Sequence, residues 1–169
     1  MQKRLPCTEQ TAVLYAQRIL KALHIHSTPV GVVELLNALE FNTFAYNADL
    51  APALSFVTAT PKSGRCIAVC KANTFEENRY LLACELAHYL FEFDNNEQCF
   101  FHAKSSLSDS EVVYRFATEL LLPEKAFVKR HKALRKYQGY MRVHKLAEQF
   151  QMPVETVRQR CQQLFPDAV

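Results

Sequence analysis

Three residues within five positions carry side chains that could do hydrolytic chemistry. Cys84 and His88 lie one helical turn apart in RYLLACELAHYLF, residues 79–91, so a helix would place a thiolate and an imidazole on one face. Both groups bind zinc, and Glu85 stands where a carboxylate can act as general base on a metal-bound water. Because a catalytic zinc ion needs three protein ligands and an open position, a third ligand must come from elsewhere in the chain.

Each of these residues also has an explanation that involves no metal. A free cysteine in a helix is most often a small buried hydrophobe, and His88 could be a hydrogen-bonded core histidine. Glu85 is harder to explain in this way, because an unpaired carboxylate among apolar neighbours is costly to bury. It should face a cleft or pair with a basic side chain. The pattern leaves both interpretations of Cys84 open and favours ligation for His88.

The elements that would position these residues follow from hydrophobic periodicity. A helix is predicted over 75–92, and a second one over 108–122 after a polar connector. Upstream of both, segments rich in Phe, Val, Thr and Ile predict strands at 42–46, 53–59 and 65–70. We therefore expect an α+β fold, in which a small three-stranded antiparallel sheet packs against two adjacent helices and a C-terminal helical pair follows.

Composition narrows the class of protein. The chain has 169 residues, of which 49% are hydrophobic and 22% charged, as in an ordinary soluble globular domain. Uninterrupted apolar runs stay well short of a membrane span, and no long apolar stretch follows the basic residues of the N-terminus, so no membrane partner is expected and the predicted location is cytoplasmic. The six cysteines lack framework spacing and are expected to be reduced.

Basic residues gather in the C-terminal third. Residues 125–145 include eight Lys or Arg and no Asp or Glu. Such a block is usually a solvated face, although it can also meet nucleic acid or an acidic partner. After it, KLAEQFQMPVETVRQRCQQLF resembles a helix-turn-helix, with Val154 to Leu164 as the recognition helix and Arg158 and Arg160 upon it. A helical hairpin that closes the domain is the favoured alternative.

Two segments together resemble the ImmA/IrrE family of zinc metallopeptidases. RYLLACELAHYLF followed by SEVVYRFATELLLP is similar to that family's H-E-x-x-H helix and its downstream E-x-E-A-N-x-F-A-x-x-L-L-x-P. The resemblance extends over most of the chain. It implies a zincin-like pair of metal-site helices, zinc as cofactor, Glu85 as catalytic base, a peptidase domain over 1–124 and a basic helical segment over 125–169. The residues on the expected letters are Glu85, His88, Phe116, Ala117, Glu119, Leu120, Leu121 and Pro123.

The departures from the family pattern concern the metal ligands. Cys84 replaces the first His, and Tyr114 replaces the Asn of the downstream motif. Ser110 and Val112 stand at the two acidic positions, with Glu111 one residue, or about 100° of helix, out of register. The predicted metal ligands are Cys84, His88 and Glu111, with Asp109 and Glu119 as alternatives for the third. Zinc is therefore expected to be held weakly or substoichiometrically.

Three functions are consistent with these observations. The leading hypothesis is an attenuated ImmA/IrrE-like zinc-dependent metallopeptidase that acts on a regulatory protein, such as a repressor of a mobile element or of a stress response. The second is a catalytically inactive pseudo-peptidase that serves as a protein-interaction module. The third is a DNA-binding regulator that uses the basic residues 125–145. By resemblance, the expected partner is a protein, a transcriptional regulator, and DNA ranks below it.

Overall fold

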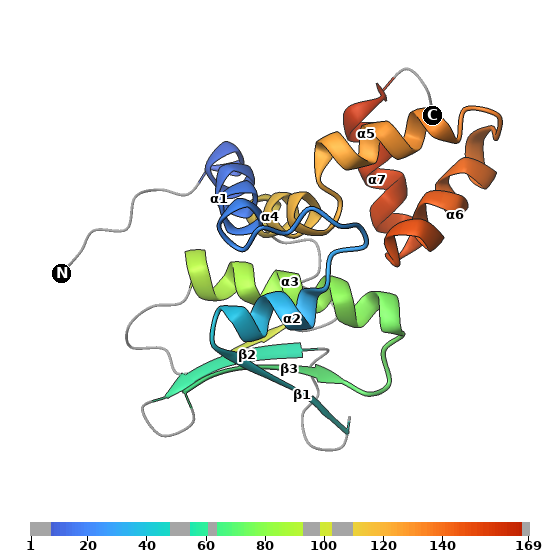
Figure 1. Ribbon diagram of the computed structural model, residues 1–169. Helices are drawn as coiled ribbons and strands as arrows, with labels where there is room; N and C mark the ends of the chain where they lie inside the picture. Colours follow the sequence, from blue (N-terminus) through green and yellow to red (C-terminus); the bar gives the residue numbers. More distant parts are fainter. Residues whose placement is uncertain (1–7, 48–54, 61–63, 93–98, 103–109, 167–169) are drawn as a thin grey trace.

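The structure of the protein, a computed structural model, describes residues 8–47, 55–60, 64–92, 99–102 and 110–166 (Figure 1). These residues form an α+β fold, as predicted. The elements in chain order are α1 (Glu9–Ala22), α2 (Val32–Ala38), β1 (Phe41–Tyr46), β2 (Ser55–Thr60), β3 (Gly64–Cys70), α3 (Phe75–Phe91), β4 (Cys99–His102), α4 (Glu111–Leu121), α5 (Glu124–Ala133), α6 (Gly139–Phe150) and α7 (Val154–Leu164). None of the helices in the described ranges is long and apolar enough to cross a bilayer.

The sheet differs from the predicted one in its pairing and in its number of strands. Its order is β1-β3-β2-β4, with β2 antiparallel to both of its neighbours. β1, however, runs parallel to β3, with Phe41 opposite Arg65 and Tyr46 opposite Cys70. The sheet is therefore mixed, and the prediction of three antiparallel strands was wrong. Alternation of apolar residues identifies a strand but not the neighbour it pairs with, and the four residues of β4 are too few to show a period.

Helix α3 crosses one face of the sheet and holds the predicted site (Figure 1). Its start is fixed by a capping box, in which Glu77 N donates to Thr74 Oγ1 at 3.2 Å and Thr74 N donates to the Glu77 carboxylate at 2.7 Å. Residues 81–88 are all buried, because α3 lies between the sheet and α4. The predicted helices at 75–92 and 108–122 are thus confirmed, and they are adjacent as expected.

The helices α5, α6 and α7 lie at one end of α3 and α4 (Figure 1). The chain between α6 and α7 turns at Gln151, which has a left-handed φ of 54°, so the predicted helical pair is confirmed. Phe150 and Val157 belong to the same buried cluster as Leu86 of α3 and Phe116 of α4. One continuous core therefore runs across residue 124, and the division at that position stays a prediction.

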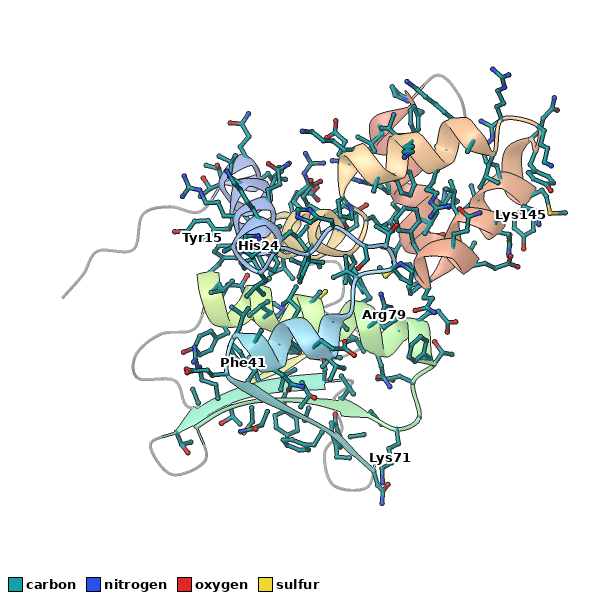
Figure 2. All side chains as sticks on the ribbon, in the orientation of Figure 1. Tyr15, His24, Phe41, Lys71, Arg79 and Lys145 are labelled. Carbon is teal, nitrogen blue, oxygen red and sulfur yellow. The ribbon has the colours of Figure 1, made fainter. Side chains whose placement is uncertain are left out.

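Arg79 connects α3 to two distant parts of the chain. Its Nε donates to the Gln151 carbonyl at 3.0 Å, and its terminal NH2 group donates to the Val30 carbonyl at 2.7 Å. Only 7% of Arg79 is exposed, and Figure 2 shows it at the end of α3 that approaches the C-terminal helices. The guanidinium thus fastens the turn after α6, and the chain that leads into α2, to the helix that holds the site.

Candidate functional site

Glu85 lies fully buried between α3 and the sheet. Its neighbour on β2 is Ser55, whose hydroxyl donates to Glu85 Oε1 at 2.6 Å. Burial raises the pKa of Glu85 to about 8, because it disfavours the charged form, while the Ser55 hydrogen bond lowers the pKa and the charge of Glu92 raises it. A carboxyl group with this pKa carries its proton at neutral pH. Protonation and a hydroxyl partner thus explain how α3 tolerates an acid in this position.

His88 is 5% exposed and is oriented by a carboxylate on its own helix. Its Nδ1 shares a hydrogen bond with Glu92 Oε2 at 2.5 Å, one turn further along α3. A carboxylate on one ring nitrogen fixes the plane and tautomer of the imidazole, and histidines that ligate metals are commonly held in this way. This arrangement is compatible with ligation by His88 as well as with a structural role.

Cys84, on α3, is buried in the core, with 1% of its surface exposed. Burial raises the pKa of its thiol far above the usual range, the nearby Glu85 raises it further, and the Tyr80 hydroxyl, within hydrogen-bonding reach, opposes the rise. The thiol is therefore protonated at neutral pH. Zinc binds the thiolate, so ligation by Cys84 would require removal of a firmly held proton.

The two positions that are acidic in the family's downstream motif hold Ser110 and Val112 in this chain, and both residues have structural roles. Ser110 is the N-cap of α4, and its hydroxyl accepts a hydrogen bond from Val113 N at 3.4 Å. Val112 packs, partly buried, against the core. Glu111 is the first residue of α4 and is exposed. Asp109, an alternative third ligand, lies outside the described residues.

Glu119, the other alternative, forms a buried ion pair with Arg160 of α7. It also accepts a hydrogen bond from Gln17 of α1 at 2.9 Å, so one carboxylate joins three helices. Both members of the ion pair are almost fully buried, and a buried carboxylate needs such a partner. Glu119 therefore links α1, α4 and α7, and its carboxylate is engaged by Arg160.

Three polar residues of α3 and its C-cap residue follow one another at intervals of four and form a single stripe: Tyr80, Cys84, His88 and Glu92. Only the middle two were predicted as site residues, although the spacing of Tyr80 and Glu92 is visible in the sequence. Ser55 was also missed, because its contact depends on how the sheet packs against α3. Tyr114 was noticed only as a departure from the family motif, and it lies near Tyr80.

The family model of the IrrE N-terminal-like domain, Peptidase_M78, matches residues 41–162, from β1 into α7. The chain belongs to this family. The resemblance seen in the sequence is thus confirmed, and the matched region includes the C-terminal helices. Among curated proteins, no significant match is found.

A solved structure of a Mycobacterium tuberculosis transcriptional regulator resembles this IrrE-like domain. The TM-score is 0.59 at 16% identity, over 94% of this chain and 48% of the regulator. At this identity the likeness shows the fold alone. This chain spans about half the length of that regulator.

The donors in the described part of this IrrE-like domain are too few for a catalytic zinc ion. Within the described ranges, no three His, Cys, Asp or Glu side chains gather into a group that could hold a metal. Cys84 and His88 supply two donors, whereas a catalytic zinc ion needs three protein ligands. Glu111 is exposed and out of register with the family's acidic positions. The assignment of these three residues as ligands therefore stays a prediction.

Proposed function

We propose that this IrrE-like protein is a pseudo-peptidase, which binds a regulatory protein without hydrolysing it. One observation carries the proposal: three positions at which the family places a histidine or an acidic residue are occupied here by side chains with structural roles. Cys84 is a buried thiol, Ser110 caps α4, and Val112 packs against the core. The expected partner is a transcriptional regulator, in keeping with the family.

An exposed apolar surface supports the binding role. Val33, Phe44 and Phe75, from α2, β1 and α3, are each at least 40% exposed, and all three line a groove of about 570 Å³. Asn78 and Arg79 add polar groups to the groove. Exposed aromatic side chains that lie close together are typical of surfaces that bind another protein.

Hydrolysis is tested with a peptide library and mass spectrometry. The full chain, with and without added Zn²⁺, is incubated with peptides derived from a bacterial proteome, and the wild type is compared with Glu85→Gln. We expect identical peptide patterns for both proteins under both conditions. Cleavage that depends on zinc and is lost in Glu85→Gln would show that the protein is an enzyme.

Binding is tested with two matched substitutions of exposed aromatic residues. Phe75, 60% exposed, lines the groove, whereas Tyr140, 75% exposed, lies on α6 and is not among the groove residues. In a two-hybrid assay against helix-turn-helix regulators from the same genome, Phe75→Ser should abolish an interaction that Tyr140→Ser preserves. Loss of the interaction in both variants, or in neither, would contradict a role for the groove.

A zinc-dependent peptidase is the second candidate, and the His88–Glu92 pair is the observation that favours it. The pair orients the imidazole as in many metal sites, and the pKa of Glu85 of about 8 is suited to proton transfer near neutral pH. Zinc, if bound, would supply a Lewis acid to polarise a peptide carbonyl. Peptide cleavage in the library experiment would decide for this candidate.

DNA binding has weaker support, because the arginines of the recognition-helix candidate are engaged within the protein. Arg160 is buried against Glu119, and Arg158 makes two hydrogen bonds to Glu155. Six basic residues of 125–145 are exposed, on α5 or just after it, where they can attract phosphates without reading bases: Lys125, Lys129, Arg130, Lys132, Arg135 and Lys136. We expect weak binding to any duplex sequence, lost between about 50 and 200 mM salt, in fluorescence anisotropy. Nanomolar, sequence-specific binding would promote this candidate.

A further inference from the structure

β1 forms one edge of the sheet, and among the described residues no strand lies on its outer side (Figure 1). At the end of β1 the Tyr46 carbonyl accepts a hydrogen bond from Lys71 N at 2.9 Å, just beyond the last residue of β3. The backbone groups of successive residues point to alternate sides of a strand, so those of Phe44 also face β3. Those of Thr43 and Ala45 face the outer side, where an added strand could bind them.

The groove beside α2 follows this edge rather than one face of the sheet. Three consecutive residues of β1 line it, Thr43, Phe44 and Ala45, although consecutive side chains of a strand point to opposite faces. On its other side the groove is lined by the exposed side chains of Val33 and Phe75. A ligand that fills the groove must therefore run alongside the backbone of β1.

The side chains of β1 do not protect this edge from pairing. Its six residues, FNTFAY, include no proline and no charged side chain, which are two common devices that keep an edge strand from pairing with another chain. Phe44 is 46% exposed, and Ala45 is exposed beside it. An open edge next to exposed aromatic side chains is the arrangement used by proteins that bind a partner by strand addition.

The charge of the groove indicates the chemistry of its ligand. Glu34 lines the groove and is exposed, and its Oε2 is folded back so far that a Cβ atom added to Gly31 would lie 2.5 Å from it. Arg79 also lines the groove, but it is almost fully buried, and its guanidinium donates to the carbonyls of Val30 and Gln151. An exposed carboxylate next to a covered guanidinium favours a ligand with a lysine or an arginine.

We propose that an extended segment of the regulatory protein pairs with the outer edge of β1 and adds a strand to the sheet. The inference rests on the proposed function and specifies how the partner is recognised. Backbone groups of the segment bind those of Thr43 and Ala45, and its apolar side chains cover Phe44 and Phe75. A lysine or arginine of the segment contacts Glu34.

The probes are synthetic peptides chosen from a library of random dodecapeptides displayed on phage, with the full chain as the target. Peptides are kept if Phe75→Ser weakens their binding at least about tenfold and Tyr140→Ser does not, which restricts the set to ligands of the groove. We expect these peptides to be rich in β-branched residues and to carry lysine or arginine. A library that yields no such peptide would overturn the proposal.

Pairing with the edge is measured by amide hydrogen exchange of the ¹⁵N-labelled chain in NMR spectra. In the free protein the amides of Thr43 and Ala45 should exchange faster than those of Asn42 and Phe44, because only the latter two bind β3. A saturating peptide should slow exchange at Thr43 and Ala45 at least about tenfold. Within the peptide, N-methylation of a single backbone amide should weaken binding about tenfold at alternate residues and little at the residues between them.

The charge of the ligand is tested with Glu34→Gln. This variant should weaken the binding of peptides with lysine or arginine by about two- to fivefold, as expected for a solvent-exposed ion pair. Glu148→Gln, at an exposed position of α6, is the matched control and should bind them like the wild type. Equal affinities for all three proteins would contradict a basic ligand.

The outcomes separate this inference from the proposed function. Peptides that bind the groove but leave exchange at Thr43 and Ala45 fast, or that tolerate N-methylation at every residue, would overturn strand addition and leave a binding groove in place. Slow exchange of these two amides in the free protein, with a dimeric mass in analytical ultracentrifugation, would assign the edge to a second copy of the chain and overturn the proposal. Zinc-dependent cleavage of the proteome-derived peptides would instead overturn the proposed function, without altering the measurements at the edge.

Discussion

Glu85 has different affinities for a proton in the folded and the unfolded chain. In the folded protein burial raises its pKa to about 8, against about 4.3 in an unfolded chain. The native state therefore binds the proton more tightly throughout this window. The stability that Glu85 contributes is complete below about pH 4.3, declines as the pH rises and is lost once the pH passes about 8.

The pH dependence of stability should respond to Glu85→Gln. Glutamine has the shape of the protonated carboxyl group and does not titrate, so the melting temperature of the variant should fall less than that of the wild type between pH 5 and pH 9. The variant should be the more stable protein at the alkaline end. Differential scanning calorimetry over this range measures both effects, with Glu148→Gln, at an exposed position of α6, as the control. Parallel curves for all three proteins would show that Glu85 is ionised when folded.

The sequence could predict only those features of the candidate site that follow from spacing along a single helix. Placement of Cys84 and His88 on one face of a helix follows from their spacing, and the structure agrees. The hydroxyl partner of Glu85 could not be found in this way, because Ser55 is 30 residues away along the chain and meets it only when β2 packs under α3. Tyr80 is different, since its spacing from Cys84 was visible in the sequence.

The ion pair of Glu119 and Arg160 joins α4 to α7 inside the core. Arg160→Met should destabilise the protein by about 3–5 kcal/mol, because it leaves a buried carboxylate without its counter-charge. Urea denaturation measures this loss, and Arg158→Met, at an exposed position of the same helix, should change little. The double variant Glu119→Met/Arg160→Met should recover part of the stability. Equal midpoints for the two single variants would contradict the assignment of a structural ion pair.

Periodicity predicted the helices better than the sheet, for a physical reason. The buried stripe of a helix such as α4 is specified by residues within a few turns, so its face can be read locally. The pairing of β1 with β3 depends instead on where the intervening β2 lies, and β2 takes the far side of β3. β4 adds a partner to β2 from a segment that looked like a polar connector.

The shared core makes a prediction about the whole molecule. Phe127, Leu146, Phe150 and Val157 all lie beyond residue 124, and all belong to the cluster that includes α3 and α4. A fragment of residues 1–124 should therefore lose cooperative thermal unfolding, because its core would be open to water. Addition of a separate fragment of residues 125–169 should restore it. Cooperative unfolding of the first fragment alone, near the wild-type midpoint, would instead establish a domain boundary at 124.

The two hydrogen bonds of Arg79 also have a consequence for synthesis of the chain on the ribosome. One acceptor, Val30, precedes Arg79 by 49 residues, but the other, Gln151, follows it by 72. At about 5–20 residues per second, Arg79 waits roughly 4–14 s after its own translation before Gln151 is made. During this interval the Arg79 guanidinium has only the Val30 carbonyl of its two backbone acceptors, and the buried cluster that α3 shares with the C-terminal helices is incomplete and open to chaperones. Slow codons between α4 and α7 should lengthen this interval and lower the soluble yield without changing the finished protein.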